Sequence, residues 1–306
     1  IVSLREDLLK ILNENRELKP LDNDLRELFK SWFNPGFLKL AKITWDTKAA
    51  VLEKIIQYER VHKIKDMNEL KRRLGEDRRF FSYFHPALED EPIIFVQVAL
   101  TNGLGKSIQE IMKPSTEGAK KYDTATFYSI SNCQEGLSRV TLGNFLIKRV
   151  VYEIQEELPN IKNFGTLSPI PGFRDWFETL DEKIIQNILG NIPFSNISFL
   201  KSKSLRIGDG RIVSNKNAII KLVAHYLTKE RNKKDRPIND VCRFHLGNGA
   251  IIDDININAN VSEVGFKRSF GVMVNYLYEL KNIEKNHENF INNKKIIISD
   301  QLKKKL

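Results

Sequence analysis

The stretch Thr124–Phe173 decides the expected fold, and it reads TATFYSIS (124–131), NCQEGLSRVTLGN (132–144), FLIKRVVYEIQEELPNI (145–161) and KNFGTLSPIPGF (162–173). The first segment is rich in aromatic and β-branched residues, which favours a strand. Gly136 and Gly143 interrupt the second segment, which favours a turn. Apolar residues recur at helical spacing in the third, and Pro159 ends that helix. The stretch therefore predicts strand, turn, helix and second strand.

The turn between the first strand and the helix is a candidate phosphate site. A helix N-terminus leaves backbone N–H groups unpaired and carries the positive end of the helix dipole, and both attract an anion. A plain strand-to-helix turn that binds nothing fits the same residues, because two glycines alone are a weak motif.

Ser168 is the first candidate for chemistry. The second strand ends at Leu167 and Ser168, because the Pro169-Ile170-Pro171-Gly172 run interrupts both helix and strand ladder. The hydroxyl of Ser168 is therefore expected at a strand end, where open sheets hold their ligands.

Composition limits the class of protein. The chain has 306 residues with a formal net charge of +10 and only two cysteines, too few for a disulfide framework or the usual zinc patterns. No run approaches the length of a membrane span, and the N-terminus lacks a signal-peptide pattern. The positive charge suits either nucleic acid or a small ligand with several negative charges. Because the basic residues are scattered, we expect the small anion and no nucleic-acid or membrane partner.

The remaining elements are read from their periodicity. Two strands, 79–85 and 92–100, are expected to pair as an antiparallel hairpin, and two helices should open the chain. A strand is predicted over 242–245, followed by Gly247 and Gly249. A helix is predicted over 273–282.

His245 is the second candidate for chemistry. It stands in RFHLGNGA (243–250), where a strand gives way to two glycines, so we expect His245 at a strand end, as for Ser168. A serine and a histidine form a minimal pair that binds an anion and shuttles one proton near neutral pH. Because no Asp or Glu has nucleophile-elbow spacing, a hydrolase triad is not indicated.

Several long runs resemble the malonyl-CoA decarboxylase family, in the order of that family and over nearly the whole chain. They are HPALEDEPIIFVQVALT, FYSISNCQEGLSRVTLGNFLIKRVV, FGTLSPIPGF, CRFHLGNGA and GVMVNYLYEL. The resemblance implies an α+β fold with an acetyltransferase-like, mixed, mostly antiparallel sheet flanked by helices. It also implies that residues 1–33 are the C-terminal end of a helical domain and that 34–306 form the catalytic domain.

The resemblance assigns roles to individual residues. Ser168 matches the catalytic serine of the LSPIPGF motif, His245 the catalytic histidine of the FHLxNGA motif, and Tyr278 a tyrosine near the site. The segment that holds the coenzyme A pyrophosphate matches Ser138, Arg139, Val140, Thr141, Leu142, Gly143 and Asn144. Asn260 stands where the family commonly has Asp, a change that either weakens the orientation of His245 or is neutral.

The implied reaction converts malonyl-CoA to acetyl-CoA and carbon dioxide through a thioester enolate, with no metal and no cofactor besides the coenzyme A of the substrate. Ser168 would contact the carboxylate or the thioester oxygen and His245 would deliver the proton, or the reverse. The resemblance further implies a homo-oligomer. The heavy use of Lys, Asn and Ile and the absence of a targeting signal favour a bacterial cytoplasm, with a mitochondrial matrix as the alternative. The alternative function is an acyl-CoA-binding or acyl-transferring relative without decarboxylase activity.

Overall fold

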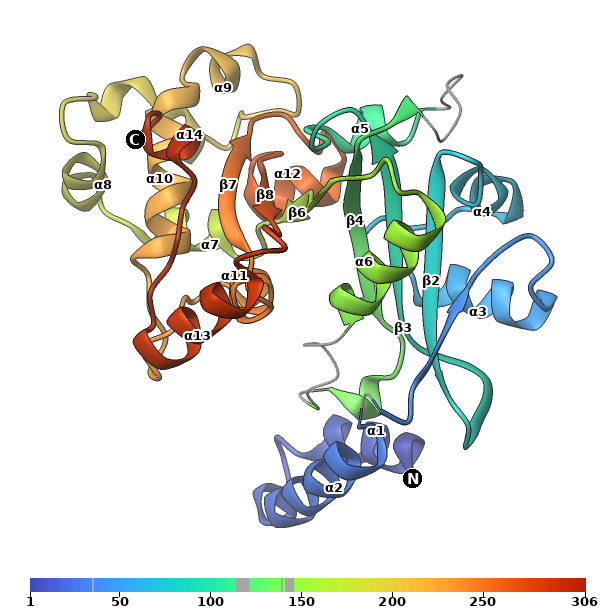
Figure 1. Cartoon of the computed structure of the whole chain (residues 1–306). Helices are drawn as coiled ribbons and strands as arrows, with labels where there is room; N and C mark the ends of the chain where they lie inside the picture. The colour runs from blue at the N-terminus through green and yellow to red at the C-terminus, as the bar shows by residue number, and fades with distance from the viewer. Residues whose placement is uncertain (35, 114–120, 139, 141–145) are drawn as a thin grey trace. The chain divides into compact units, whose positions relative to one another are not determined.

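The structure is a computed structural model that describes residues 1–34, 36–113, 121–138, 140 and 146–306. The chain divides into two compact units (Figure 1). The first holds residues 1–100, 121 and 127–160 and the second residues 101–113, 122–126 and 161–306, apart from the residues outside the description. Both units combine antiparallel strands with helices, as the sequence predicts for an α+β fold.

The first unit is built on four neighbouring strands. Strand β1 (Lys39–Lys42) pairs antiparallel with β2 (Arg78–His85), β2 pairs antiparallel with β3 (Leu88–Thr101), and β4 (Thr124–Asn132) is the next strand in the order. The predicted hairpin is thus confirmed, although β3 begins inside the expected loop. Its other elements are α1 (Val2–Ile11), α2 (Lys19–Trp32), α3 (Ala49–Tyr58), α4 (Met67–Arg73) and α6 (Leu146–Glu157).

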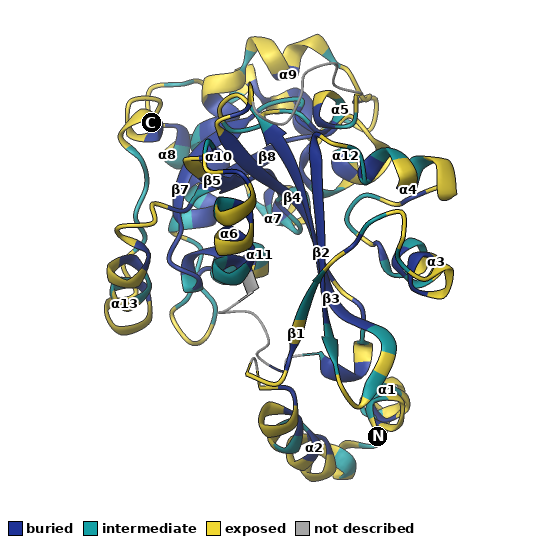
Figure 2. Cartoon of the chain, turned by 45° about the vertical axis from the view of Figure 1, so that its right-hand side comes forward, coloured by how far each residue is buried: buried dark blue, intermediate teal, exposed yellow. Residues whose placement is uncertain are grey.

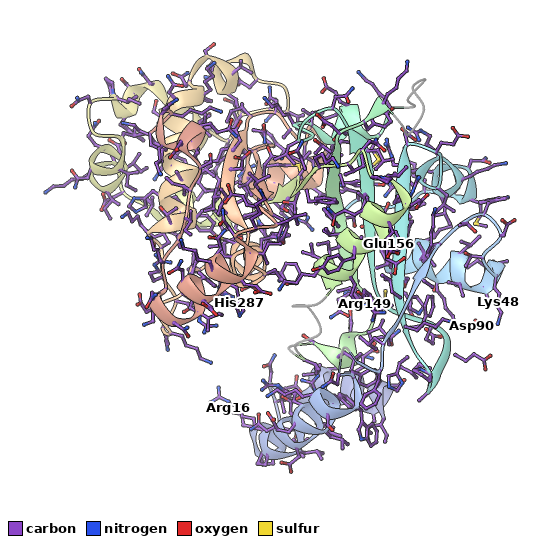
Figure 3. All side chains as sticks on the ribbon, viewed as in Figure 1. Arg16, Lys48, Asp90, Arg149, Glu156 and His287 are labelled. Atoms are coloured by element: carbon purple, nitrogen blue, oxygen red, sulfur yellow. The ribbon has the colours of Figure 1, made fainter. Side chains whose placement is uncertain are left out.

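Helix α6 is fastened to the strands of its own unit by charged side chains. Arg149, labelled in Figure 3, donates from Nη1 to the carbonyl oxygen of Leu38 at 2.9 Å. At the other end, Glu157 accepts from Lys42 on β1 at 2.8 Å and from Nε of Arg79 on β2 at 3.0 Å. These contacts fix the helix that follows the predicted phosphate-binding turn.

The second unit is organised around β8 (Met273–Leu277). This strand pairs antiparallel with β5 (Asn163–Thr166), with β6 (Ser168–Pro169) and with β7 (Ile251–Asn256). The strands of this unit are largely buried in Figure 2, and its exposed residues lie mostly on helices and loops. The helices of this unit are α5 (Ile108–Ile111), α7 (Phe173–Thr179), α8 (Glu182–Leu189), α9 (Gly210–Ser214), α10 (Lys216–Thr228), α11 (Asp240–Gly247), α12 (Glu263–Ser269), α13 (Ile283–Asn293) and α14 (Asp300–Lys303).

Two predicted elements of this unit are wrong, and both carry site residues. The expected strand over 242–245 is part of helix α11, which begins where the Asn239 side chain accepts a hydrogen bond from the backbone N–H of Cys242 at 2.8 Å. The expected helix over 273–282 begins with the central strand β8. Its residues from Met273 to Tyr276 are all buried, so both faces are covered and no period distinguishes strand from helix.

Candidate functional site

Ser168 lies on β6, pairs with Val274 of β8 and is buried. Its hydroxyl donates to Oγ1 of Thr166, the last residue of β5, at 2.8 Å. The acceptor lies only two residues earlier in the chain, and the interruption of the strand at Leu167 brings the two hydroxyl groups together.

The strand predicted to end at Ser168 instead ends at Thr166. Ser168 begins β6, in which Pro169 still pairs with Met273. The Pro-Ile-Pro run therefore does not interrupt the ladder at Pro169.

His245 reaches the same hydroxyl from helix α11. Its Nε2 lies 3.0 Å from Ser168 Oγ, and the ring is buried. The imidazole stacks on the ring of Tyr276 from β8, with centroids 4.5 Å apart and an angle of 25° between the planes. The two residues predicted to act together are therefore in hydrogen-bond contact, within one compact unit of the chain.

Tyr278 orients the other side of the histidine ring. Its hydroxyl lies 2.8 Å from His245 Nδ1. The backbone N–H of Tyr278 donates to the carbonyl oxygen of Phe164, which fixes the tyrosine just after β8. Both ring nitrogens of His245 are thus bonded to hydroxyl groups, one on each side.

Asn260 does not orient His245. Its Oδ1 accepts from the backbone N–H of Ser262 at 3.1 Å and from the Ser262 hydroxyl at 2.7 Å, in the turn before α12. Of the two readings left open by the sequence, the structure favours the neutral one for histidine orientation, since Tyr278 and Ser168 hold both ring nitrogens.

Burial sets the protonation of this site. Desolvation lowers the pKa of His245 to about 3, and it raises the pKa of Tyr278 well above its usual value of 10. At neutral pH the imidazole is therefore uncharged, with one N–H donor and one bare nitrogen acceptor. Since the Ser168 hydroxyl gives its hydrogen to Thr166, the consistent arrangement has Nε2–H donating to Ser168 and Tyr278 O–H donating to Nδ1.

The structure adds residues that the sequence did not single out. Asn275 of β8 donates to the carbonyl oxygens of Thr166 at 2.7 Å and Gly105 at 2.9 Å. Asn256 of β7 in turn donates to Asn275 Oδ1 at 2.6 Å. Asn275 and Tyr276 begin the NYxY motif that ends at Tyr278, and this adjacency is the signal that could have found them.

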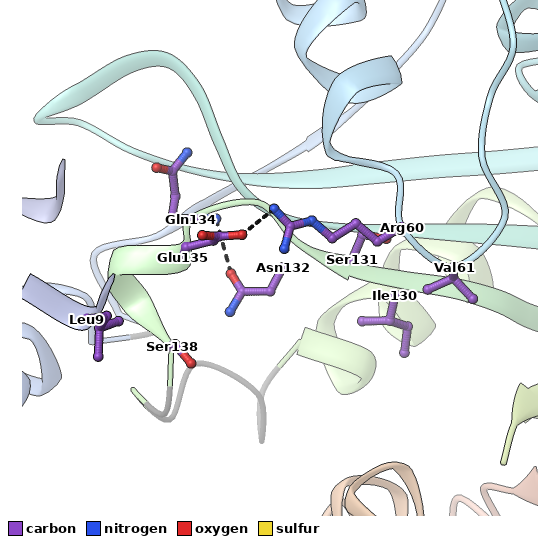
Figure 4. A pocket seen from close by; sticks show the side chains of 9 residues that line it. All are labelled: Leu9, Arg60, Val61, Ile130, Ser131, Asn132, Gln134, Glu135 and Ser138. Atoms are coloured by element: carbon purple, nitrogen blue, oxygen red, sulfur yellow. Dashed lines mark hydrogen bonds and ion pairs between the residues drawn. The ribbon is translucent and has the colours of Figure 1, made fainter. Parts of the chain in front are cut away.

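Of the predicted pyrophosphate-binding segment, Ser138 and Val140 fall within the described residues, whereas Arg139, Thr141, Leu142, Gly143 and Asn144 lie outside them. Ser138 follows a single 3-10 turn, Glu135–Leu137, and its backbone N–H donates to the Glu135 carbonyl at 2.8 Å. It lines a pocket of about 430 Å³ together with Leu9, Asn132 and an ion pair between Arg60 and Glu135 at 2.7 Å (Figure 4).

Within the described ranges, no group of three or more His, Cys, Asp and Glu side chains is placed to hold a metal ion. Among the same residues, none of the helices is both long enough and apolar enough to cross a membrane. Both cysteines are free and buried, and burial raises the pKa of Cys242 to about 12.

Comparison with known families gives two matches that together cover most of the chain. Residues 1–33 match the malonyl-CoA decarboxylase N-terminal domain, and residues 36–306 match the malonyl-CoA decarboxylase C-terminal domain.

Individual relatives agree with these matches. The mitochondrial malonyl-CoA decarboxylase of Anser anser anser is 36% identical over 99% of this chain, and that of Mus musculus is 35% identical over the same share. The chain spans 65% and 66% of the length of these two relatives. The crystal structure of malonyl-CoA decarboxylase from Rhodopseudomonas palustris is 41% identical with a TM-score of 0.90, over 99% of this chain and 70% of that one. The corresponding structure from Agrobacterium vitis is 39% identical with a TM-score of 0.86, over 99% and 75%.

Proposed function

Because the chain belongs to the malonyl-CoA decarboxylase family, we propose that it converts malonyl-CoA to acetyl-CoA and carbon dioxide. The observation that carries the proposal is the buried contact of 3.0 Å between Ser168 Oγ and His245 Nε2. We assign residues 34–306 to the catalytic domain and residues 1–33 to the end of a helical domain.

The reaction breaks the bond between C2 of the malonyl group and its carboxylate carbon. The electron pair of that bond passes into the thioester as an enolate, and C2 then takes up one proton, which the overall reaction draws from solvent. A site that places donors at the thioester oxygen lowers the barrier, because negative charge develops there in the transition state. A site that excludes water strengthens those donors.

In this scheme Ser168 and His245 supply the donors. In the protein as described, His245 Nε2–H donates to Ser168 and the Ser168 hydroxyl donates to Thr166. A substrate oxygen takes the place of one of these acceptors, so that the two groups bind either the carboxylate or the thioester oxygen. A substrate anion next to the imidazole raises the pKa of His245, because an opposite charge favours the protonated form. His245 thereby takes up the proton that C2 later receives, and Tyr278 keeps Nδ1 aligned throughout.

Substrate binding is assigned to two further groups. Residues Ser138 to Asn144 hold the coenzyme A pyrophosphate, as the strand–turn–helix pattern and the family motif both favour. The family resemblance assigns Tyr278 to the substrate-binding residues as well, and its hydroxyl contacts His245 Nδ1. The proposed chemistry uses no metal and no organic cofactor beyond the coenzyme A of the substrate.

The cellular setting is part of the same proposal. We assign the chain to a bacterial cytoplasm, with a mitochondrial matrix as the alternative, and to a homo-oligomer that has neither nucleic acid nor membrane as a partner. The relatives of known structure are bacterial, which supports the first compartment, and the curated relatives are mitochondrial, which supports the second.

Acetyl-CoA formation from malonyl-CoA by the purified chain, after treatment with a chelator, tests the proposal. The variants Ser168→Ala and His245→Ala should each lower kcat by about 10²–10⁴-fold, the usual share of a positioned proton donor. His225→Ala is the matched control, since His225 lies on α10 and pairs with Glu230. A parent chain that binds coenzyme A but forms no acetyl-CoA would be an acyl-CoA-binding relative instead. Full activity in Ser168→Ala would overturn the assigned roles.

A further inference from the structure

A single buried amide joins the two segments that carry Ser168 and His245. Nδ2 of Asn239 donates to the carbonyl oxygen of Pro171 at 2.8 Å, and Oδ1 of Asn239 accepts from the backbone N–H of Cys242 at 2.8 Å. The Asn239 residue is 2% exposed. All five residues belong to the second unit, so the connection lies within one compact part of the chain.

The two partners decide which way the Asn239 amide faces. A backbone N–H can only donate and a carbonyl oxygen can only accept, so the amide oxygen faces Cys242 and the amide nitrogen faces Pro171. An ionised aspartate would accept from Cys242 but would place an oxygen against the Pro171 carbonyl. A leucine of similar size would bond to neither group. The asparagine side chain is therefore matched to both contacts.

The carbonyl group of Pro171 is also held from a second direction. The Tyr226 hydroxyl on α10 donates to its oxygen at 3.1 Å, and a Cβ atom added at Gly172 would lie 3.0 Å from that hydroxyl. Pro171 comes three residues after Ser168, and the rings of Pro169 and Pro171 fix φ in the backbone between them. A displacement of the Pro171 carbonyl therefore reaches Ser168 through a short, stiff segment.

Cys242 stands in the corresponding position before His245. It precedes the histidine by three residues on α11, which is about one turn of a helix, and the helical hydrogen bonds make that turn rigid. Asn239 is the N-cap of the same helix, and its own carbonyl oxygen accepts from the backbone N–H of Arg243 at 3.0 Å. The Asn239 side chain therefore fixes the first turn of α11, and His245 lies on the next turn.

We propose that Asn239 is a positioning residue that sets the distance between Ser168 and His245, an inference that rests on the proposed function. The contact of 3.0 Å joins Ser168 Oγ on a strand to His245 Nε2 on a helix, 77 residues apart in the sequence. Hydrogen bonds weaken steeply as their geometry worsens, and small misplacements of reacting groups cost large factors in rate. Asn239 holds the two segments together close to both members of the pair.

The variant Asn239→Ser tests the proposal because it separates the two contacts of the amide. Serine caps a helix about as well as asparagine, so α11 should keep its N-terminus while the bond to Pro171 is lost. We expect kcat for malonyl-CoA to fall about tenfold, with KM within about twofold of the parent. Tyr226→Phe removes the other donor to Pro171 and should lower kcat about threefold. Asp181→Ser changes the N-cap of α8 in the same way and is the control, which should match the parent.

A double-mutant cycle distinguishes positioning from a general effect on stability. Asn239→Ser should change the residual kcat of Ser168→Ala less than about twofold, because the contact that Asn239 positions is already lost in that background. A merely structural role would lower the melting temperature and would lower kcat by the same factor in both backgrounds.

Two results would overturn the inference: equal losses in the two backgrounds, or a folded Asn239→Ser whose kcat equals that of the parent. Should Asn239→Ser not fold, Tyr226→Phe is taken through the same cycle, and a kcat equal to that of the parent would then contradict the role of the Pro171 carbonyl and with it the inference.

The same measurements separate this inference from the proposed function. A parent chain that forms acetyl-CoA, combined with an unchanged Asn239→Ser, contradicts only the role of Asn239. A parent chain that forms no acetyl-CoA from malonyl-CoA contradicts the proposed function, and the role of Asn239 fails with it.

Discussion

The carboxylate of Glu59 in the first unit and the imidazole of His245 in the second are both buried, and both are held by several hydrogen bonds. They use those bonds differently. Glu59 accepts from the backbone N–H groups of Val61 at 2.7 Å and His62 at 2.9 Å. Its remaining acceptor positions are taken by the side chains of Gln97, Ser129 and Ser131.

The Glu59 cluster is saturated. Two carboxylate oxygens offer about four lone-pair positions, and all of them are in use, because three donors share Oε1 and two contact Oε2. No acceptor position is left over for a substrate proton, and the two backbone donors tie the end of α3 to the residues that follow it. The physical role of Glu59 is therefore to fix this loop against β3 and β4.

The His245 cluster leaves its protons exchangeable. Each ring nitrogen contacts a hydroxyl, and a hydroxyl both donates and accepts. A proton can move along Tyr278, His245 and Ser168 without any movement of the heavier atoms. Moving a donor away from Glu59 would instead disrupt the loop that follows α3. Burial and hydrogen bonding alone therefore do not mark a site of chemistry, whereas the freedom to reassign protons does.

The largest expected effect is on stability, and it follows from a substitution at Glu59. Glu59→Ala strands buried donors that lose a charged acceptor, so the free energy of unfolding should fall by about 3–5 kcal/mol. The kcat of the protein that remains folded should stay within about twofold of the parent. Urea denaturation measures the free energy of unfolding, and steady-state kinetics measure kcat. The control is Glu53→Ala, at an exposed position of the same helix. A large loss of kcat without loss of stability would reverse the roles given to the two clusters.

The second effect is a pH dependence that belongs to His245. Its pKa is about 3 in the folded protein and about 6.5 when unfolded, so the unfolded state binds more protons between these values. The stabilisation that the protein gains from neutral His245 is fully present above pH 6.5 and is lost as the pH falls toward 3. At pH 5 this residue should lower the free energy of unfolding by about 2 kcal/mol.

Urea denaturation of the parent and of His245→Asn at pH 7.5 and pH 5 measures this contribution of His245 to the free energy of unfolding. The difference in unfolding free energy between the two pH values should be smaller in the variant by about that amount. An identical pH dependence in both proteins would mean that His245 is not held neutral by burial.

The sequence pointed to three residues that the structure brings into contact, but it was wrong about the elements that carry two of them. Ser168, His245 and Tyr278 were identified from motifs, yet His245 was placed on a strand and Tyr278 on a helix. The segment 242–245 is too short to show a period, and a strand with both faces covered shows none. The hairpin and α6 were predicted correctly, because their patterns are long.

The residues missed by sequence reasoning share one property. Thr166, Asn275 and Glu59 are ordinary polar residues whose importance comes from burial among partners distant in sequence. For Asn275 the adjacent Tyr276 and Tyr278 are the one available signal, and the neighbours of Glu59 in sequence offer none. For Thr166, the interruption of the strand between β5 and β6 brings its hydroxyl to Ser168, and this geometry is visible only in the fold.

A third effect sharpens the account of the His245 cluster. Tyr278→Phe removes the hydroxyl that holds Nδ1 and leaves a buried nitrogen without its donor. A lost partner of this kind costs about 1–3 kcal/mol, so kcat should fall about tenfold. Steady-state kinetics with malonyl-CoA measure it, and Tyr152→Phe on an exposed position of α6 is the matched control. An unchanged kcat would show that Ser168 and the ring stacking on Tyr276 suffice to orient His245.

The smallest effect concerns Thr166. Thr166→Val keeps the shape of the side chain but removes the acceptor of the Ser168 hydroxyl, and the expected fall in kcat is about fivefold, or about 1 kcal/mol. Thr166→Ser, which restores a hydroxyl, should recover the parent's kcat, and Thr179→Val on an exposed position of α7 should not change it. If Thr166→Val instead retained full activity, the Ser168 hydroxyl would not need this acceptor. Its hydrogen would then point to His245 Nε2, and the proton of the neutral imidazole would lie on Nδ1, facing Tyr278.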